Sequence, residues 1–144
     1  MPEILSRYFK VLLEPGVELE KVNRKCRFSW WSDEPPKLEE KLDQIVQKVS
    51  GVLEIPLLMF SSNLRIFKDQ EAVNAYHKQL HGGMPTHAKA VYVHASNTIC
   101  ASEKDISKDV LVHEMGHALA FHFFQKRPPR AIDELIAMYA DEKI

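Results

Sequence analysis

Two histidines four residues apart, with a glutamate directly after the first, form the pattern in this chain that points most clearly to chemistry. They are His113, Glu114 and His117, within the stretch VLVHEMGHALAFH (110–122). Positions i and i+4 lie on the same face of an α-helix, so both imidazoles can bind one ion. Glu114 projects about 100° round the helix from His113 and can reach a water beside that ion. The pattern predicts His113 and His117 as zinc ligands and Glu114 as the base that activates the water.

The residues around the two histidines favour a metal site over a polar helix surface or a pair of core histidines. Most of them are apolar, as expected of a core helix: Val110, Leu111, Met115, Ala118 and Phe121. An unpartnered His or Glu would be costly there. Gly116 costs about 1 kcal/mol relative to alanine inside a helix, so we expect a neighbouring backbone to pack against it. The alternative that remains is a helical-core protein without stoichiometric zinc.

A catalytic zinc needs a third protein ligand. His122 lies five positions after His117, about 140° round the helix, and cannot share the ion. The longer motif H-E-x-x-H-x-x-G-x-x-H fails, because positions 120 and 123 are Ala and Phe. RPPR (127–130) ends the helix, and the segment that follows predicts a last helix with Asp133 and Glu134. We expect Glu134 to be the third ligand, with Asp133 as its main alternative.

The last helix, AIDELIAMYADEKI (131–144), must pack beside the histidine helix to present that carboxylate. We expect it to pack through its larger apolar residues, with the small Ala137 allowing close approach: Ile132, Leu135, Ile136 and Tyr139. Asp133 or Asp141 is then available to orient a ligand histidine through its second ring nitrogen.

The elements that position these residues follow from apolar periodicity. An N-terminal stripe predicts a helix that Pro15-Gly16 ends: Ile4, Leu5, Tyr8, Phe9, Leu12 and Leu13. CRFSWW (26–31) favours a strand. From residue 32 the patterns predict helix, strand, helix, strand, strand, helix and helix. In that order, Gly51 is the expected C-cap of the first helix, Asp69 the N-cap of the second, and residues 95–97 the turn between the paired strands.

HEMGH (113–117), followed 17 residues after His117 by E-x-x-A (134–137), resembles the gluzincins. These are zinc peptidases in which an HExxH helix is followed by a "glutamate helix". The small size is similar to that of the minigluzincins, and ELIAMYA (134–140) resembles the glutamate helix of anthrax-lethal-factor-like peptidases. From about residue 63, the element order is similar to the catalytic N-terminal subdomain of thermolysin. The resemblance implies an α+β, zincin-like fold: a small mixed β-sheet packed with a backing helix, the HExxH helix and a C-terminal glutamate helix.

The resemblance also implies roles for individual residues. His113, His117 and Glu134 would be the zinc ligands, and Glu114 the general base and acid. The backbone of Val91, Tyr92 and Val93 would pair with an extended peptide substrate. Alternation in residues 90–94 independently predicts a strand with one buried face, and a sheet edge offers unpaired backbone groups. A plain edge strand without a ligand is the alternative.

One part of a gluzincin site has no obvious counterpart. Many gluzincins supply a Tyr or His that stabilises the oxyanion, but no Tyr lies between residues 117 and 138. Four residues remain as candidates: Arg127, Arg130, Tyr139 and His122. One oxyanion donor is worth roughly 2.7–4 kcal/mol in hydrolases, so a missing donor predicts low activity.

Length and composition favour one domain, 1–144, with a catalytic core at 63–144 and an N-terminal extension, 1–55, whose role the sequence leaves open. The chain has 144 residues, 45% hydrophobic and 27% charged, and a net charge of −1. This composition gives no indication of nucleic-acid or membrane partners. No apolar run approaches the roughly 20 residues of a membrane span, and the N-terminus lacks signal-peptide features. Two cysteines without CxxC spacing suggest a reducing compartment, so we expect a cytoplasmic protein.

We therefore expect a zinc-dependent metalloendopeptidase that cleaves a peptide or protein substrate with a zinc-activated water. The alternative is a zinc-binding scaffold or regulatory module of the same fold with little or no proteolytic activity. The intact Glu114 disfavours that alternative, and the missing oxyanion residue favours it. The remaining polar and aromatic residues of interest are expected at the surface, in loops or in the core: His77, His81, His87 and His94 at the surface or in loops, Cys26 as a buried structural thiol, and Trp30-Trp31 in the core.

Overall fold

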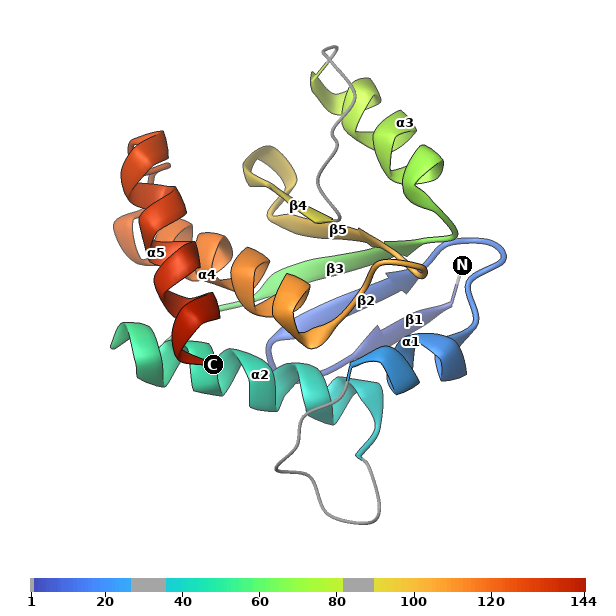
Figure 1. Ribbon diagram of the computed structural model, residues 1–144, viewed down its shortest axis with the longest axis horizontal. Coiled ribbons are helices and arrows are strands. Elements are labelled where there is room, and N and C mark those ends of the chain that lie inside the picture. Colours follow the sequence, from blue (N-terminus) through green and yellow to red (C-terminus); the bar gives the residue numbers. More distant parts are fainter. Residues whose placement is uncertain (1, 27–35, 82–89) are drawn as a thin grey trace.

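The computed structural model describes residues 2–26, 36–81 and 90–144, and within them the chain forms a mixed β-sheet with helices on both faces (Figure 1). The strand order is β1-β2-β3-β5-β4. β2, β3 and β5 are parallel neighbours, and the two outer strands, β1 and β4, run antiparallel to the strands beside them. The strands are β1 (Glu3–Leu5), β2 (Phe9–Leu13), β3 (Ser62–Phe67), β4 (Ala90–Val93) and β5 (Thr98–Ser102).

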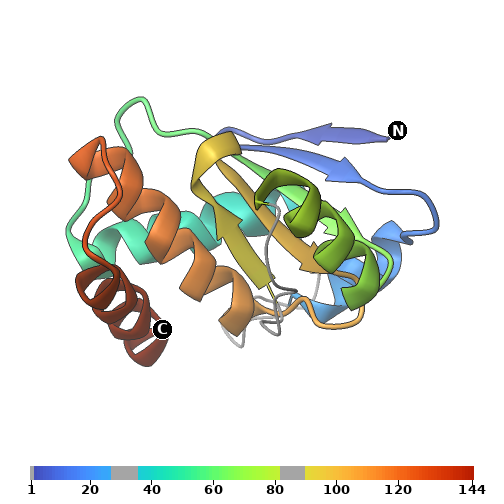
Figure 2. The same ribbon diagram turned by 90° about the horizontal axis from the view of Figure 1, so that it is seen from above.

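The helices form a layer on each side of the sheet (Figure 2). α3 (Gln70–His81) covers one face over β3 and β5, whereas α2 (Leu38–Leu53) and α4 (Lys108–Phe124) cover the other. α5 (Arg130–Lys143) packs outside α4 and α2, and α1 (Leu19–Lys25) leads from β2 toward α2. The main core lies between the sheet, α2 and α4, and a smaller one lies beneath α3. The α+β fold that the sequence predicts is confirmed.

From residue 36 onward, the predicted order of helices and strands is confirmed. Asp69 caps α3 as expected, because its Oδ1 accepts a hydrogen bond from the Ala72 amide at 2.9 Å. The expected turn at 95–97 is a short 3₁₀ helix, η1 (His94–Ser96), followed by Asn97 with φ of 50°. The expected C-cap at Gly51 is wrong. α2 continues to Leu53 and ends at Glu54, which adopts φ of 56° and whose amide bonds to the Ser50 carbonyl.

The N-terminal helix prediction is also wrong, because residues 3–13 form β1 and β2. Along β2, Phe9, Val11 and Leu13 point into the core, and the whole strand pairs with β3, about fifty residues further along the chain. The Asp43 carboxylate on α2 holds the turn before β2 by accepting hydrogen bonds from the Arg7 and Tyr8 amides at 2.9 and 3.1 Å. Pairing between distant strands therefore overrides a short stripe that fits either period.

Part of the sequence prediction lies outside the described residues. This holds for the strand at 26–31 beyond Cys26, for Trp30-Trp31 and for His87. Cys26 itself follows α1 and is fully buried, and its burial raises the pKa of the thiol to about 12. A buried structural thiol is thus confirmed.

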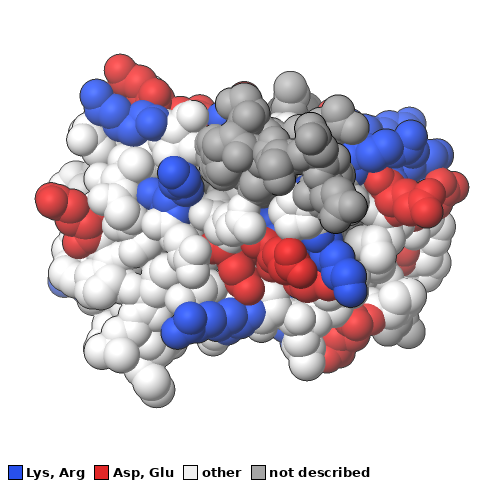
Figure 3. Space-filling view, turned by 90° about the horizontal axis from the view of Figure 1, so that it is seen from below, with Lys and Arg blue, Asp and Glu red and all other residues white. Residues whose placement is uncertain are grey.

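The described helices are all too short or too polar to cross a lipid bilayer. On the face seen in Figure 3, acidic and basic side chains lie close to one another in small groups instead of forming one large field of a single sign.

Candidate active site

α4 crosses the core and carries the histidine motif on the side that faces β4. Ser107 caps its first turn by accepting a hydrogen bond from the Val110 amide at 3.2 Å. The apolar residues of α4 that face the sheet and α2 are almost completely buried: Leu111, Val112, Met115, Ala118 and Leu119. A helix fixed along its length in this way holds the histidine motif in one orientation.

His113, Glu114 and His117 come together as the motif predicts. One potential ligand atom from each lies within 4.8 Å of the others. The two imidazole rings are 5.1 Å apart between centroids, and their planes are inclined at 75°. His117 and Glu114 are buried, whereas the His113 side chain is 27% exposed. The group is therefore open to a ligand from one side.

α5 approaches α4 closely at Gly116. A Cβ atom added to Gly116 would lie 3.0 Å from the Cα of Ala137, which is tighter than nine in ten real Cβ contacts. The expectation that another backbone packs against Gly116 is confirmed, as is the close approach at Ala137. Two small residues thus set the distance between the helix with the histidines and the helix with Glu134.

The predicted packing face of α5 is wrong. Its buried residues are Asp133, Ala137 and Ala140, whereas Ile132, Leu135 and Tyr139 are about half exposed or more, and Ile136 is half-buried. The reason is the close contact at Gly116, which admits only small side chains between the helices. This orientation places Asp133 inside and Glu134 at the rim of the site.

Glu134 and Asp133 contact different ring nitrogens. The Glu134 carboxylate oxygens lie 3.5 Å from His113 Nε2 and 3.2 Å from His117 Nε2. Two ligand atoms on one tetrahedral zinc are about 3.3–3.4 Å apart, given bonds of about 2.0–2.1 Å. The two separations, which join the two rings to different oxygens of Glu134, are close to this spacing.

Asp133 meets His117 on the opposite side of its ring. Its Oδ1 lies 2.8 Å from His117 Nδ1, and both side chains are at least nine-tenths buried. A carboxylate only accepts hydrogen bonds, so Nδ1 carries the proton and Nε2 keeps its lone pair for a metal. Asp141, which the sequence offers for the same task, is exposed near the end of α5 and makes no hydrogen bond or ion pair with any described histidine.

His94 also lines this cleft: it lies in the turn between β4 and β5, as the loop prediction has it, but it is not at the surface. Its side chain is only 17% exposed, and its Nε2 lies 3.6 Å from the second oxygen of Asp133. The ring packs edge-on against Tyr92 and Phe121, at 4.8 and 5.2 Å between centroids. Burial, followed by the positive charge of Arg127, lowers the His94 pKa. Its position directly after the edge strand is the only signal the sequence gives.

The pKa of Glu114 is raised to about 8. Burial is the main cause. A backbone hydrogen bond from Tyr92 opposes it, and the negative charges of Glu134 and Asp133 add to it. A carboxylate with a pKa near the operating pH suits a group that must take up a proton and release it again.

A cleft of about 350 Å³ joins these groups to the edge strand. Its walls come from β4, the histidine motif and the start of α5: Ala90, Val91, Tyr92, His94, His113, Glu114, His117, Arg127, Arg130, Asp133 and Glu134. The predicted edge position of β4 is confirmed. Val91 and Tyr92 line the cleft, whereas the Val93 side chain is buried in the small core beneath α3.

The four oxyanion candidates lie in different places. Arg127 and Arg130 line the cleft. His122 lies elsewhere, with its Nε2 3.0 Å from the Leu58 carbonyl oxygen and its ring against Phe60. Tyr139 is half-exposed, and its ring lies beneath the Lys143 ammonium.

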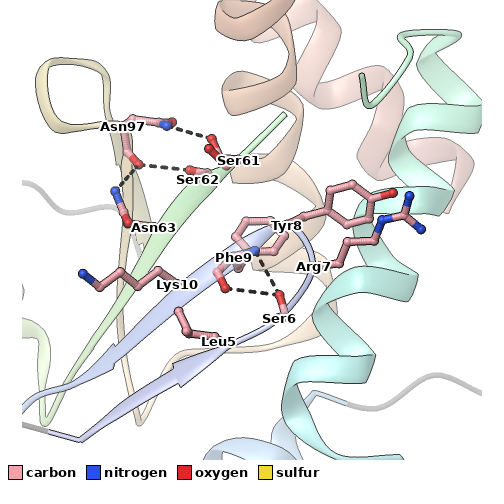
Figure 4. A pocket seen from close by; sticks show the side chains of 10 residues that line it. All are labelled: Leu5, Ser6, Arg7, Tyr8, Phe9, Lys10, Ser61, Ser62, Asn63 and Asn97. Carbon is pink, nitrogen blue, oxygen red and sulfur yellow. Dashed lines mark hydrogen bonds between the residues drawn. The ribbon is translucent and has the colours of Figure 1, made fainter. Parts of the chain in front are cut away.

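A second hollow, of about 330 Å³, lies at the turn between β1 and β2 (Figure 4). No Cys, His, Asp or Glu is among its described lining residues. Its polar groups largely bond one another, since Asn97 donates to the Ser61 carbonyl at 2.8 Å and accepts from Ser62 Oγ at 3.0 Å. These bonds join the start of β3 to the turn before β5, so this hollow has a structural explanation.

The contact at Gly116 predicts that valine substitutions at two glycines, Gly116 and Gly51, differ in their effect on stability. Gly116→Val should destabilise the metal-free protein by about 1–3 kcal/mol, because the added atoms crowd the α5 backbone, which must shift to admit them. It should also weaken zinc binding by moving Glu134. Gly51→Val, in α2 with nothing within 4 Å of the added Cβ, is the matched control and should change stability by less than about 0.5 kcal/mol. Urea unfolding measures both, and equal effects would contradict the close contact.

The raised pKa of Glu114 predicts a pH dependence in the metal-free protein. Its ordinary value is 4.5 and its folded value about 8, so the folded state holds the proton more tightly. This contribution to stability is fully present below pH 4.5 and is lost as the pH rises toward 8. Glu114→Gln should flatten the curve of unfolding free energy against pH in this window. Parallel curves for the two proteins would refute the assignment.

Comparison with known proteins gives one match. A family model described as peptidase family M48 matches residues 36–137, more than two thirds of the chain. The matched segment runs from just before α2 into α5 and includes every residue that lines the cleft. No curated protein and no solved structure matches the chain.

Proposed function

The chain belongs to peptidase family M48, a family of metal-dependent peptidases, and on this premise we propose that it is a zinc-dependent metalloendopeptidase. His113, His117 and Glu134 are the proposed zinc ligands, and Glu114 is the proposed general base and acid. In this proposal the site is of the gluzincin type, and the substrate is a peptide or protein.

The different contacts that Asp133 and Glu134 make with the histidines support this proposal most strongly. Glu134 lies within 3.5 Å of both Nε2 atoms, whereas Asp133 bonds to Nδ1 of His117. A zinc site of this kind needs one carboxylate as ligand and another partner that orients a ligand histidine. The two neighbouring residues of α5 match both requirements.

The side chains then have the following tasks. Bound zinc would polarise the scissile carbonyl and acidify a water. The Glu114 carboxylate takes the proton from the attacking water and passes it to the nitrogen of the leaving amine. Asp133 keeps His117 in the tautomer that binds metal. The outer edge of β4 beside Val91 aligns an extended substrate along the cleft by backbone pairing, whereas the Tyr92 backbone bonds to Glu114.

A cleavage assay with controlled metal content tests this function. The zinc-loaded protein should cleave members of a broad peptide library, lose this activity on treatment with a chelator, and regain it when one equivalent of zinc is restored. Zinc-loaded protein that is folded but inert on the whole library would instead support the zinc-binding scaffold. Absence of near-stoichiometric zinc at neutral pH would instead support the alternative of a helical-core protein that does not bind zinc.

A further inference from the structure

Two arginines, one on the loop between α4 and α5 and one at the start of α5, line the same cleft as the histidine motif. Arg127 and Arg130 are both exposed at the surface, yet both line the cleft together with Glu114 and Glu134. The charge of Arg127 extends into the site, since it contributes to the lowered pKa of His94. Both arginines therefore border the space that part of a bound substrate would occupy.

Neither guanidinium is used to hold the described fold together. No ion pair or hydrogen bond joins Arg127 or Arg130 to another described residue, although three carboxylates line the same cleft. Both arginines therefore keep their donors for a ligand. A guanidinium offers a planar fork of N–H groups that matches both oxygens of a carboxylate.

The loop between them is stiff. Arg127 precedes Pro128-Pro129, so its backbone is restricted to extended conformations, and Pro128 is buried. Pro129 stands immediately before α5 with φ of −51°, and Arg130 is the first residue of that helix. Two prolines thus fix the points from which both side chains enter the cleft, which lowers the entropic cost of binding a ligand.

Resting on the function proposed above, we propose that Arg127 and Arg130 form a carboxylate-binding subsite of the peptidase. Its preferred substrates are peptides with a carboxylate close to the scissile bond, supplied by the C-terminus or by an Asp or Glu side chain. The subsite also has an electrostatic task. Asp133 and Glu134 give the cleft negative charge, and two arginines offset its repulsion of an anionic peptide.

Binding to the Glu114→Gln protein tests the subsite without hydrolysis. The probes are two pairs of dye-labelled alanine pentapeptides: one pair with a free or an amidated C-terminus, the other amidated with central Glu or Gln. Fluorescence anisotropy of the zinc-loaded protein should show about tenfold tighter binding of the carboxylate member in at least one pair. The pair that discriminates identifies the source of the carboxylate.

Substitution of the arginines completes the test. Arg127→Gln/Arg130→Gln should bring the ratio of Kd values within each pair close to one and leave the neutral peptides unchanged. Lys126→Gln removes an exposed charge from the same loop outside the cleft lining and should leave the ratio at its original value. Ratios near one before substitution, ratios unaffected by the double substitution, or no binding of either carboxylate peptide at millimolar concentration would each overturn the proposal.

Hydrolysis assays on protein that retains Glu114 distinguish a failure of this proposal from a failure of the proposed function. Arginine-dependent discrimination in binding without any cleavage would leave the subsite standing and refute the peptidase. Cleavage of acidic and neutral peptides alike, with equal losses of kcat in the double variant and unchanged Kd, would retain the peptidase and refute the subsite. In that case the arginines would act on the oxyanion.

Discussion

Glu114→Gln is expected to lower kcat/KM for peptide hydrolysis by about 10²–10⁴-fold while leaving zinc bound. Glutamine has nearly the same shape as glutamate, but its amide cannot take up the proton of the attacking water. Metal binding should persist because the ring nitrogens of His113 and His117 and the Glu134 carboxylate are unchanged. The buried position of Glu114 favours a neutral side chain, so the variant should also fold.

Hydrolysis rates and bound zinc per chain, measured on the same preparation, check this prediction. Glu142→Gln, an exposed glutamate on α5, is the matched control and should have the original rate. A Glu114→Gln protein that cleaves at close to the original rate would remove Glu114 from the mechanism. Loss of bound zinc together with loss of activity would instead indicate that Glu114 is a zinc ligand.

Glu134→Ala is expected to weaken zinc binding more than Asp133→Ala does. Loss of the partner of a ligand histidine typically lowers metal affinity by about 10–100-fold, and we expect this range for Asp133→Ala. Loss of Glu134 removes a ligand, so its effect should exceed that range. Asp133→Asn tests orientation with less disturbance, because its amide oxygen can still accept a hydrogen bond from His117 Nδ1.

Competition with a zinc chelator of known affinity measures these losses. Asp141→Ala is the control on the same helix, and its exposed position predicts an affinity within about twofold of the original. A larger loss of zinc affinity for Asp133→Ala than for Glu134→Ala would indicate that Asp133 is the third ligand. A large loss for Asp141→Ala would show that the exposed end of α5 contributes to the site.

The site is predictable from the sequence where it depends on local periodicity. His113 and His117 share a face because the helix repeat places them there, and the cost of Gly116 indicates a neighbouring backbone. The orientation of α5 could not be predicted in the same way. The contact between Gly116 and Ala137 sets it, and apolar size alone would have turned Ile132 and Leu135 inward.

Features that depend on distant pairing were missed. The apolar residues near the N-terminus fit a helix or a strand, and only the neighbouring β3 decides between them. His94 enters the site because β4 is the edge strand beside α4, which no spacing in the chain indicates. Arg127 and Arg130 are candidates from the sequence, together with Tyr139 and His122, and only the packing of α5 shows which of the four line the cleft.

The ligand shell of the bound metal tests the central claim most directly. Crystals of the protein loaded with one equivalent of zinc, measured on both sides of the zinc absorption edge, locate the ion by anomalous scattering. We predict one site, bound by Nε2 of His113, Nε2 of His117 and a carboxylate oxygen of Glu134, at about 2.0–2.2 Å. Zinc bound to other residues, or no ordered zinc between α4 and α5, would contradict the account.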